Sequence, residues 1–188
     1  ALEARGIAHD ARGFLRPQRG YVVWSERGGT FARMVAADGA VLAEAVRLGP
    51  SCAGGVAATQ TSDGSTWVAC LRRGNAPKDD VGGVGVWRLA RGSVQLHAQF
   101  GTAGTDASGI ALVAEERDLV VLWQDASPGQ TRIMRAEVPR DAAGAPHTSS
   151  IEPRALSVDA LVGTGPALVL HEGHAVALLD LDIAHGDV

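Results

Sequence analysis

The sequence lacks the features expected of membrane-spanning and nucleic-acid-binding chains. Its longest apolar stretch, residues 167–170 with their neighbours, is interrupted by His171, Glu172 and His174, so it is too short to cross a bilayer. The formal net charge is −4 and there is no run of lysines or arginines, so no basic surface for nucleic acid is expected. The first residues, 1–5, show neither an initiator Met nor a signal-peptide pattern, so we expect a mature product or an excised piece.

Cysteine is also scarce, since the chain contains only Cys52 and Cys70. Two cysteines are too few for a disulfide-rich scaffold. In a hairpin that turns at Asp63 and Gly64, Cys70 would lie opposite about residue 57 or 58, which leaves Cys52 beyond reach unless the loop folds back. We therefore favour Cys70 as a buried apolar residue over a disulfide.

Glycine, by contrast, is abundant. The 188 residues include 24 glycines, and 46% of the residues are hydrophobic, which argues against general disorder. Many glycines among short apolar runs are typical of meandering antiparallel strands joined by tight turns. The composition therefore favours an all-β chain, and we treat residues 1–188 as a single domain.

A short apolar motif recurs along the chain. Val22-Val23-Trp24 is followed by Val68-Ala69-Cys70, by Val121-Leu122-Trp123 and, more loosely, by Val176-Ala177-Leu178, at spacings of about 46, 53 and 55 positions. Such a period is typical of four-stranded propeller blades with variable loops. We predict that Trp24, Cys70 and Trp123 occupy equivalent, largely buried positions on the second strands of successive blades.

The resulting prediction is a β-propeller segment of about three and a half blades. The blades are expected at residues 6–48, 54–100 and 108–152, with a partial blade at 159–183. Their predicted strands are 6–10, 20–25, 30–36 and 41–48, then 56–60, 66–71, 84–89 and 94–100, then 109–114, 119–123, 131–138 and 148–151, and finally 161–162 or 167–170 followed by 175–179. Because this count leaves strand edges unpaired, we expect a larger or oligomeric ring, with edges paired to parent-chain blades or to another subunit.

Residues 22–42 also support a resemblance to a known class of protein. An apolar pair, Trp24, a polar turn and a strand ending at Asp38-Gly39 follow one another, and residues 119–138 repeat part of this order, whereas Cys70 replaces the tryptophan in the second blade. The pattern resembles the repeats of secreted bacterial propeller proteins. This resemblance implies a secreted or cell-envelope location and usually no assigned reaction.

Residues 61–67, Thr-Ser-Asp-Gly-Ser-Thr-Trp, look like the Asp-box turn of sialidase-like propellers. They lack the residue usually found between Asp63 and Gly64, and they fall between the first two strands of a blade, whereas the family's box joins the third and fourth. Asp boxes are structural turns in that family. We therefore predict a turn here and no sialidase chemistry.

The sequence contains no motif that assigns catalysis. It has neither Gly-x-Ser-x-Gly nor HExxH, and His171-Glu172-Gly173-His174 is better explained as a polar β-turn than as a metal site, even with His185 and Asp187 as further ligands. The loop carboxylates match no calcium-binding loop and are better explained as solvated turn residues. We assign no catalytic residue, metal or cofactor, and favour a non-enzyme.

The loops at one end of the blades are the favoured binding surface. Connections after the second strand and between blades emerge on the same face in an up-and-down blade. The predicted site residues are Glu26, Arg27, Arg72, Arg73, Asp79, Asp80, Asp106 and Asp125. Their mixed charge favours a non-catalytic, extracytoplasmic scaffold that contacts a protein or a glycan. The alternative is part of a propeller hydrolase or lyase whose active site is completed by absent blades.

Overall fold

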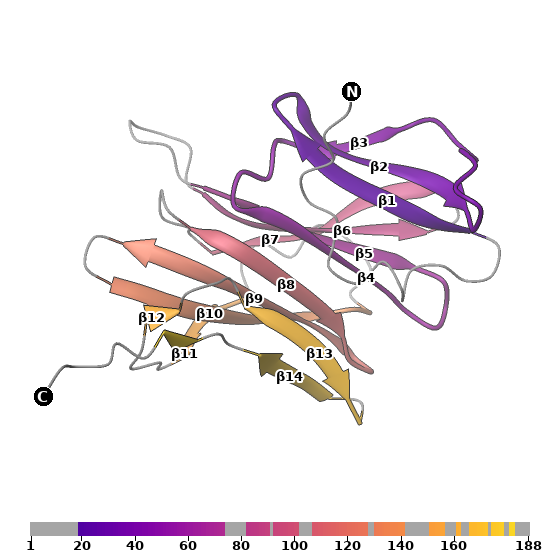
Figure 1. Cartoon of the computed structure of the whole chain (residues 1–188). Helices are drawn as coiled ribbons and strands as arrows, with labels where there is room; N and C mark the ends of the chain where they lie inside the picture. The colour runs from indigo at the N-terminus through magenta and orange to yellow at the C-terminus, as the bar shows by residue number, and fades with distance from the viewer. Residues whose placement is uncertain are drawn as a thin grey trace, which may run out of the picture.

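The fold was examined in a computed structural model (Figure 1). The structure describes residues 19–73, 82–90, 92–101, 107–127, 130–141, 151–156, 161–162, 166–172, 174–178 and 181–182. Within these ranges every regular element is a β-strand, which confirms the all-β prediction. All pairings between the strands are antiparallel, and no sheet in the described part closes on itself. The same residues contain no helix long and apolar enough to cross a membrane.

The first sheet has three described strands in the order β1-β2-β3. They are β1 (Arg19–Glu26), β2 (Gly29–Ala36) and β3 (Val46–Gly49). The predicted strands 20–25 and 30–36 are confirmed, but the predicted strand 41–48 is shortened. Val41 forms only an isolated bridge with Val35. A turn in which the Gly39 amide donates to the Ala36 carbonyl at 3.0 Å brings Val41 beside β2, and the chain then leaves the sheet until β3 begins. The predicted strand 6–10 lies outside the described residues.

The second sheet contains four strands in chain order, as predicted. They are β4 (Gly55–Gln60), β5 (Thr66–Arg72), β6 (Gly83–Ala90) and β7 (Ser93–Phe100), each within one residue of its predicted bounds. From Thr66 to Leu71, every residue of β5 is buried. This burial on both faces explains why β5 is a continuous apolar run rather than an alternating one.

The third sheet also has four strands, in the order β11-β10-β9-β8. They are β8 (Ser108–Ala114), β9 (Asp118–Ser127), β10 (Gln130–Pro139) and β11 (Arg154–Leu156). Of the predicted outer strand at 148–151, only Ile151 lies within the described residues, and the outer strand that the structure describes is β11. Ile151 belongs to the hydrophobic core rather than to a strand, and pairing with β10 begins only after Pro153, which has no amide hydrogen to donate.

Two short pairs of strands follow the third sheet. β13 (Ala167–His171) pairs with β14 (His174–Leu178), and β12 (Leu161–Val162) pairs with β15 (Leu181–Asp182). The sequence left two alternatives for the first strand of the last blade, residues 161–162 and residues 167–170. Both form strands, but β12 pairs with β15 whereas β13 pairs with β14. The hairpin β13–β14 lies against β8 of the third sheet.

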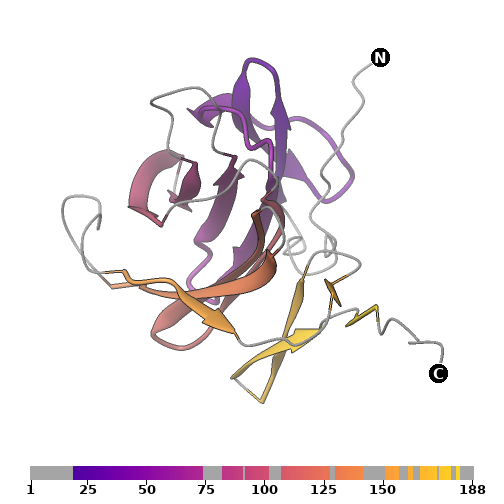
Figure 2. The ribbon, with the colours of Figure 1, turned by 90° about the vertical axis from the view of Figure 1, so that its left-hand side faces the viewer.

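The three larger sheets are stacked face to face, with the second sheet in the middle (Figures 1 and 2). Side chains alternate between the two faces of β5, so that Val68 and Cys70 pack towards the first sheet whereas Trp67 and Leu71 pack towards the third. Two hydrophobic cores result, one on each side of the middle sheet.

Trp24, Cys70 and Trp123 lie on corresponding faces of their sheets. Cys70 packs towards the first sheet and Trp123 packs towards the second, so each faces the sheet that precedes its own. In the first sheet, Tyr21 and Val23 face the second sheet. Because side chains alternate along a strand, Trp24 lies on the outer face of the first sheet, away from the second. Cys70 and Trp123 are 0% and 1% exposed. Trp24 is only partly buried, whereas the prediction was a largely buried side chain. No described sheet packs against the outer face of the first sheet, on which Trp24 lies.

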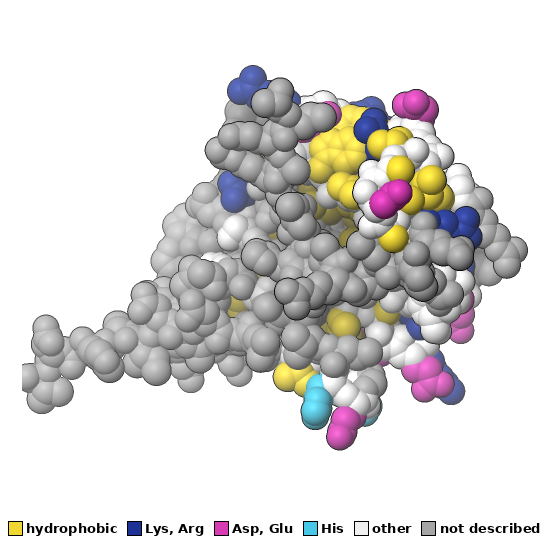
Figure 3. Space-filling view, turned by 45° about the vertical axis from the view of Figure 1, so that its right-hand side comes forward, with side chains coloured by type: hydrophobic (Ala, Val, Ile, Leu, Met, Phe, Trp, Pro, Cys, Tyr) yellow, Lys and Arg dark blue, Asp and Glu magenta, His cyan; other side chains and the backbone are white. Residues whose placement is uncertain are grey.

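The outer face of the first sheet is consequently more open than the two cores. Trp24 stacks on Phe31 with the ring centroids 5.7 Å apart, and the guanidinium carbon of Arg33 lies 5.8 Å from the Trp24 ring centroid. Val22, beside Trp24, is 46% exposed. Figure 3 shows hydrophobic side chains at the surface in the upper part of the molecule, where Figure 1 places this sheet.

Cys52 and Cys70 form a disulfide, with their Cα atoms 5.3 Å apart, so the expectation of an unpaired Cys70 is wrong. Cys70 lies opposite Val56 rather than residue 57 or 58. The chain before Val56 also folds back, because the Gly55 amide donates a hydrogen bond to the Cys52 carbonyl at 3.0 Å. This turn brings Cys52 over β5 and within bonding distance of Cys70.

Candidate functional site

The predicted binding residues that the structure describes all lie at one end of the stacked sheets. This is the end at which the turn between β1 and β2 is found. Glu26 and Arg27 belong to this turn, Arg72 and Arg73 lie at the end of β5, and Asp125 lies near the end of β9. Glu26, Arg27 and Arg73 are exposed, whereas Arg72 and Asp125 are partly buried. The other predicted residues, Asp79, Asp80 and Asp106, lie outside the described residues.

Contacts between the sheets show that these strand ends lie side by side. The Cys52 amide donates to Ser25 Oγ of β1 at 2.8 Å, and Cys52 is bonded to Cys70 of β5. Arg73 Nε donates to the Ala107 carbonyl at 2.8 Å, immediately before β8 begins. Ser108 of β8 pairs with Gln124 of β9, which places Asp125 at the same end. We call this end of the stack, with the residues Glu26, Arg27, Arg72, Arg73 and Asp125, the loop end.

The histidines near the C-terminus form the predicted polar turn. His171 and His174 pair across the β13–β14 hairpin, and both are exposed. In the ranges that the structure describes, no group of three or more His, Cys, Asp and Glu side chains could hold a metal ion. The further candidate ligands His185 and Asp187 lie outside these ranges.

A groove of about 880 Å³ opens at the opposite end, between the first and second sheets. Its walls come from β1, β2, the β4–β5 turn, β6 and β7. Among the residues that the structure describes, the polar side chains at its walls are Arg19, Tyr21, Gln60, Asp63, Ser65, Arg88, Ser93 and Gln95. The sequence analysis did not predict this groove, because its walls belong to segments far apart in the chain that only the packing of two sheets brings together.

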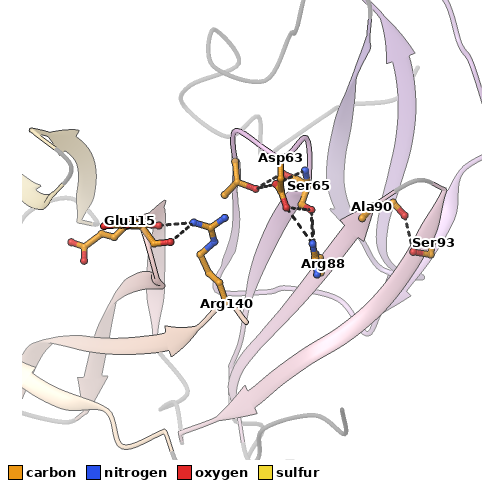
Figure 4. Close-up of polar contacts among 9 residues, drawn as sticks. Asp63, Ser65, Arg88, Ala90, Ser93, Glu115 and Arg140 are labelled. Atoms are coloured by element: carbon orange, nitrogen blue, oxygen red, sulfur yellow. Dashed lines mark hydrogen bonds and ion pairs between the residues drawn. The ribbon is translucent and has the colours of Figure 1, made fainter. Parts of the chain in front are cut away.

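Asp63 holds the β4–β5 turn together (Figure 4). Its Oδ1 accepts hydrogen bonds from Thr61 Oγ1 and from the Ser65 amide, and its Oδ2 accepts them from Ser65 Oγ at 3.0 Å and from Arg88 Nη2 at 3.3 Å. These donors, the Thr61 hydroxyl foremost, lower the pKa of Asp63 to about 2, although burial acts in the opposite direction. Asp63 is therefore ionised at neutral pH and orders the turn.

The same turn fixes Arg88 at the wall of the groove. Arg88 donates to Ser65 Oγ through Nη2 at 3.0 Å and through Nε at 3.2 Å. Its guanidinium carbon also lies 5.4 Å from the ring centroid of Trp67, which is 1% exposed. An arginine held both by hydrogen bonds and by an aromatic ring is a preorganised cation.

The wall formed by the first sheet carries a phenol and a second cation. Tyr21 is half-buried on β1, and burial raises the pKa of its hydroxyl, although the neighbouring charge of Arg19 acts to lower it. The hydroxyl therefore stays protonated at neutral pH and can donate a hydrogen bond. Arg19 itself is exposed at the start of β1.

Further polar contacts at this end of the stack connect the third sheet to the last hairpin. Arg140 Nη1 donates to the carbonyls of Glu115 and Glu116 at 2.7 Å and 2.9 Å, as Figure 4 shows for Glu115. Glu115 Oε1 accepts a hydrogen bond from the Ala175 amide of β14 at 2.7 Å. These interactions position the hairpin and are structural.

The two ends of the stack thus offer different chemistry. The loop end carries exposed charges of both signs, whereas the groove combines two guanidinium groups, one fully engaged carboxylate and several neutral polar side chains. At the groove end the hydroxyls of Thr61 and Ser65 donate to the Asp63 carboxylate, whose pKa of about 2 makes it a weak base. Comparison with protein-family models, with curated proteins and with solved structures finds no match for the chain.

Proposed function

We propose that the chain is a segment of a β-propeller scaffold that acts outside the cytoplasm and binds a protein or a glycan without catalysing a reaction. The observation that carries this proposal is that charged side chains gather at the loop end of three stacked sheets. Loops held by a rigid scaffold are the usual location of binding residues.

The stacking of the sheets supports the propeller part of the proposal. The second sheet packs against the first sheet with one face and against the third sheet with the other. The first strands of successive units are also neighbours, because β4 lies against β8 and β8 lies against β13. In a propeller, the first strand of each blade surrounds a central channel, so its neighbours are the first strands of adjacent blades.

The disulfide supports a location outside the cytoplasm. Disulfides persist in oxidising compartments and are rare in reducing ones. Cys52 and Cys70 are 5% and 0% exposed, so the bond is part of the packed structure rather than a surface feature. This agrees with the location that the resemblance to secreted propeller proteins implies.

Binding is favoured over catalysis by the state of Asp63. A general acid needs a pKa near the working pH, whereas the hydrogen bonds to Asp63 lower its pKa to about 2. Its carboxylate is also engaged by Thr61, Ser65 and Arg88, so it serves the fold rather than a reaction. Rim charges such as Glu26 and Arg27 are suited to steering and orienting a partner.

The proposal can be tested with two arrays, one of oligosaccharides and one of short random peptides. We expect the chain to bind ligands in at least one array, and we expect replacement of Glu26 and Arg27 by Ala to weaken this binding. Arg154→Ala is the control, because Arg154 is exposed on β11, away from the loop end. Unchanged binding by the double variant, or no binding in either array, would contradict the proposal. Release of cleaved saccharide would instead indicate a hydrolase or lyase.

A further inference from the structure

The groove is a separate site that the proposed function of the loop end does not use. Its volume of about 880 Å³ falls within the range of about 300 to 1,000 Å³ that is usual for small-ligand sites. The β4–β5 and β6–β7 turns that border it lie at the opposite end of β5 and β6 from Arg72. A ligand in the groove would therefore leave the loop end uncovered.

The charge of the groove favours an anion. Asp63 is the carboxylate among the described lining residues, and its charge is already shared among Thr61, Ser65 and Arg88. Arg19 adds a second guanidinium, so the described lining has one more positive than negative charge, whereas the whole chain has a net charge of −4. A guanidinium binds a carboxylate through two parallel charge-assisted hydrogen bonds.

The neutral side chains of the groove favour a ligand rich in hydroxyl groups. The amides of Gln60 and Gln95 both donate and accept hydrogen bonds, and the protonated hydroxyl of Tyr21 can donate one. The Ser93 hydroxyl donates to the Ala90 carbonyl at 2.7 Å, so its lone pairs are left to accept a hydrogen bond from a ligand (Figure 4). These groups complement sugar hydroxyls, which are also both donors and acceptors.

We propose that the groove binds a saccharide that carries a carboxylate. Arg19 pairs with the carboxylate, while Tyr21, Gln60 and Gln95 bind the hydroxyl groups. Arg88, held in place by Ser65 and Trp67, forms an ion pair with Asp63 and so reduces the repulsion between Asp63 and the carboxylate of the ligand. A nucleic acid fits less well, because affinity for a phosphate backbone grows with the number of Lys and Arg contacts and the described lining provides two arginines.

The experiment is a calorimetric titration of the full chain with an oligomer of galacturonic acid and with a galactose oligomer of equal length. We expect the acidic oligomer to bind at least about tenfold more tightly, since one charge-assisted pair is sufficient for such a difference. Arg19→Gln should remove this preference. Arg154→Gln is the matched control, because it makes the same change at an exposed arginine of the third sheet and should leave the preference intact.

Three results would overturn the proposal: no binding of the acidic oligomer, equal binding of the two oligomers, or an unchanged preference in Arg19→Gln. A glutamate oligopeptide serves as a further ligand, and binding of this peptide as tight as that of the acidic sugar would exclude a saccharide site. Replacement of Glu26 and Arg27 by Ala should leave the titration unchanged, so the groove and the loop end can fail independently. The urea midpoints of Arg19→Gln and the control should match, because Arg19 is exposed.

Discussion

Cys52 lies in the segment between the first and second sheets, and Cys70 lies in β5, the second strand of the second sheet. The disulfide joins these two residues, with their Cα atoms 5.3 Å apart. Cys52 also contacts the first sheet, because its amide donates to Ser25 Oγ at 2.8 Å and its sulfur lies beside Thr30 Oγ1. The bond therefore lies where the two sheets meet and stabilises the loop end.

Loss of this disulfide should destabilise the chain. The bond joins residues 18 positions apart, and closing a loop of this length contributes about 3 kcal/mol to the free energy of unfolding. We expect replacement of both cysteines by Ala to lower the urea midpoint accordingly. Adding a reductant should destabilise the native chain and leave the double variant unchanged. Equal midpoints for the native chain with and without reductant would contradict this expectation.

Stability should decrease in acid through Asp63. Its pKa is about 2 in the folded chain and ordinarily 3.8, so the ionised carboxylate stabilises the fold above about pH 4 and this contribution is lost as the pH falls towards 2. Because the side chain is 47% exposed, we expect less than about 1 kcal/mol. Urea unfolding at several pH values measures the effect. Asp63→Asn should show a weaker pH dependence between pH 4 and pH 2 than the native chain.

The two tryptophans at corresponding positions should differ in their contribution to stability. Trp123 is 1% exposed between the second and third sheets, so Trp123→Ala should cost about 3 to 5 kcal/mol. Trp24 is only partly buried, so Trp24→Ala should cost less. Urea denaturation followed by far-UV circular dichroism compares the two variants. An equal loss of stability in the two variants would contradict this expectation.

Gly83 should not tolerate a larger side chain. A Cβ atom at Gly83 would lie 2.8 Å from the Gly101 carbonyl oxygen, which belongs to the backbone and cannot rotate away. We expect Gly83→Ala to lower the free energy of unfolding by about 1 to 3 kcal/mol. Gly28→Ala is the control, since a Cβ atom there would meet no other atom closer than 4.0 Å. A similar thermal midpoint for both variants would contradict this interpretation.

The second sheet was predictable because its sequence alternates clear strands with clear turns. Asp63-Gly64 and Gly92 mark two of its turns, and Gly64 and Gly92 have φ values of 85° and 81°, which favour glycine. The outer strand of the third sheet was not predictable from the same signals. It has three residues, too few for an apolar period, and it begins only after Pro153.

The loop end could be predicted from topology, whereas the groove and the disulfide could not. In an up-and-down sheet, alternate turns emerge at the same end, and this rule alone brings Glu26, Arg72 and Asp125 together. The groove depends on the packing of two sheets, because Arg19 lies in the first sheet and Arg88 in the second, and both line the groove. The disulfide depends on a single turn before Val56, and a shift of one or two residues in the expected register was enough to conceal it.

The position of the disulfide makes the two ends of the stack mechanically unequal. The chain crosses from the first sheet to the second near Cys52, at the loop end, and the bond to Cys70 holds the crossing there. In the described ranges, no covalent connection between these sheets lies at the end with the groove. Any change in the angle between the sheets would therefore be smallest near the disulfide and would alter the width of the groove more than the spacing of the loops.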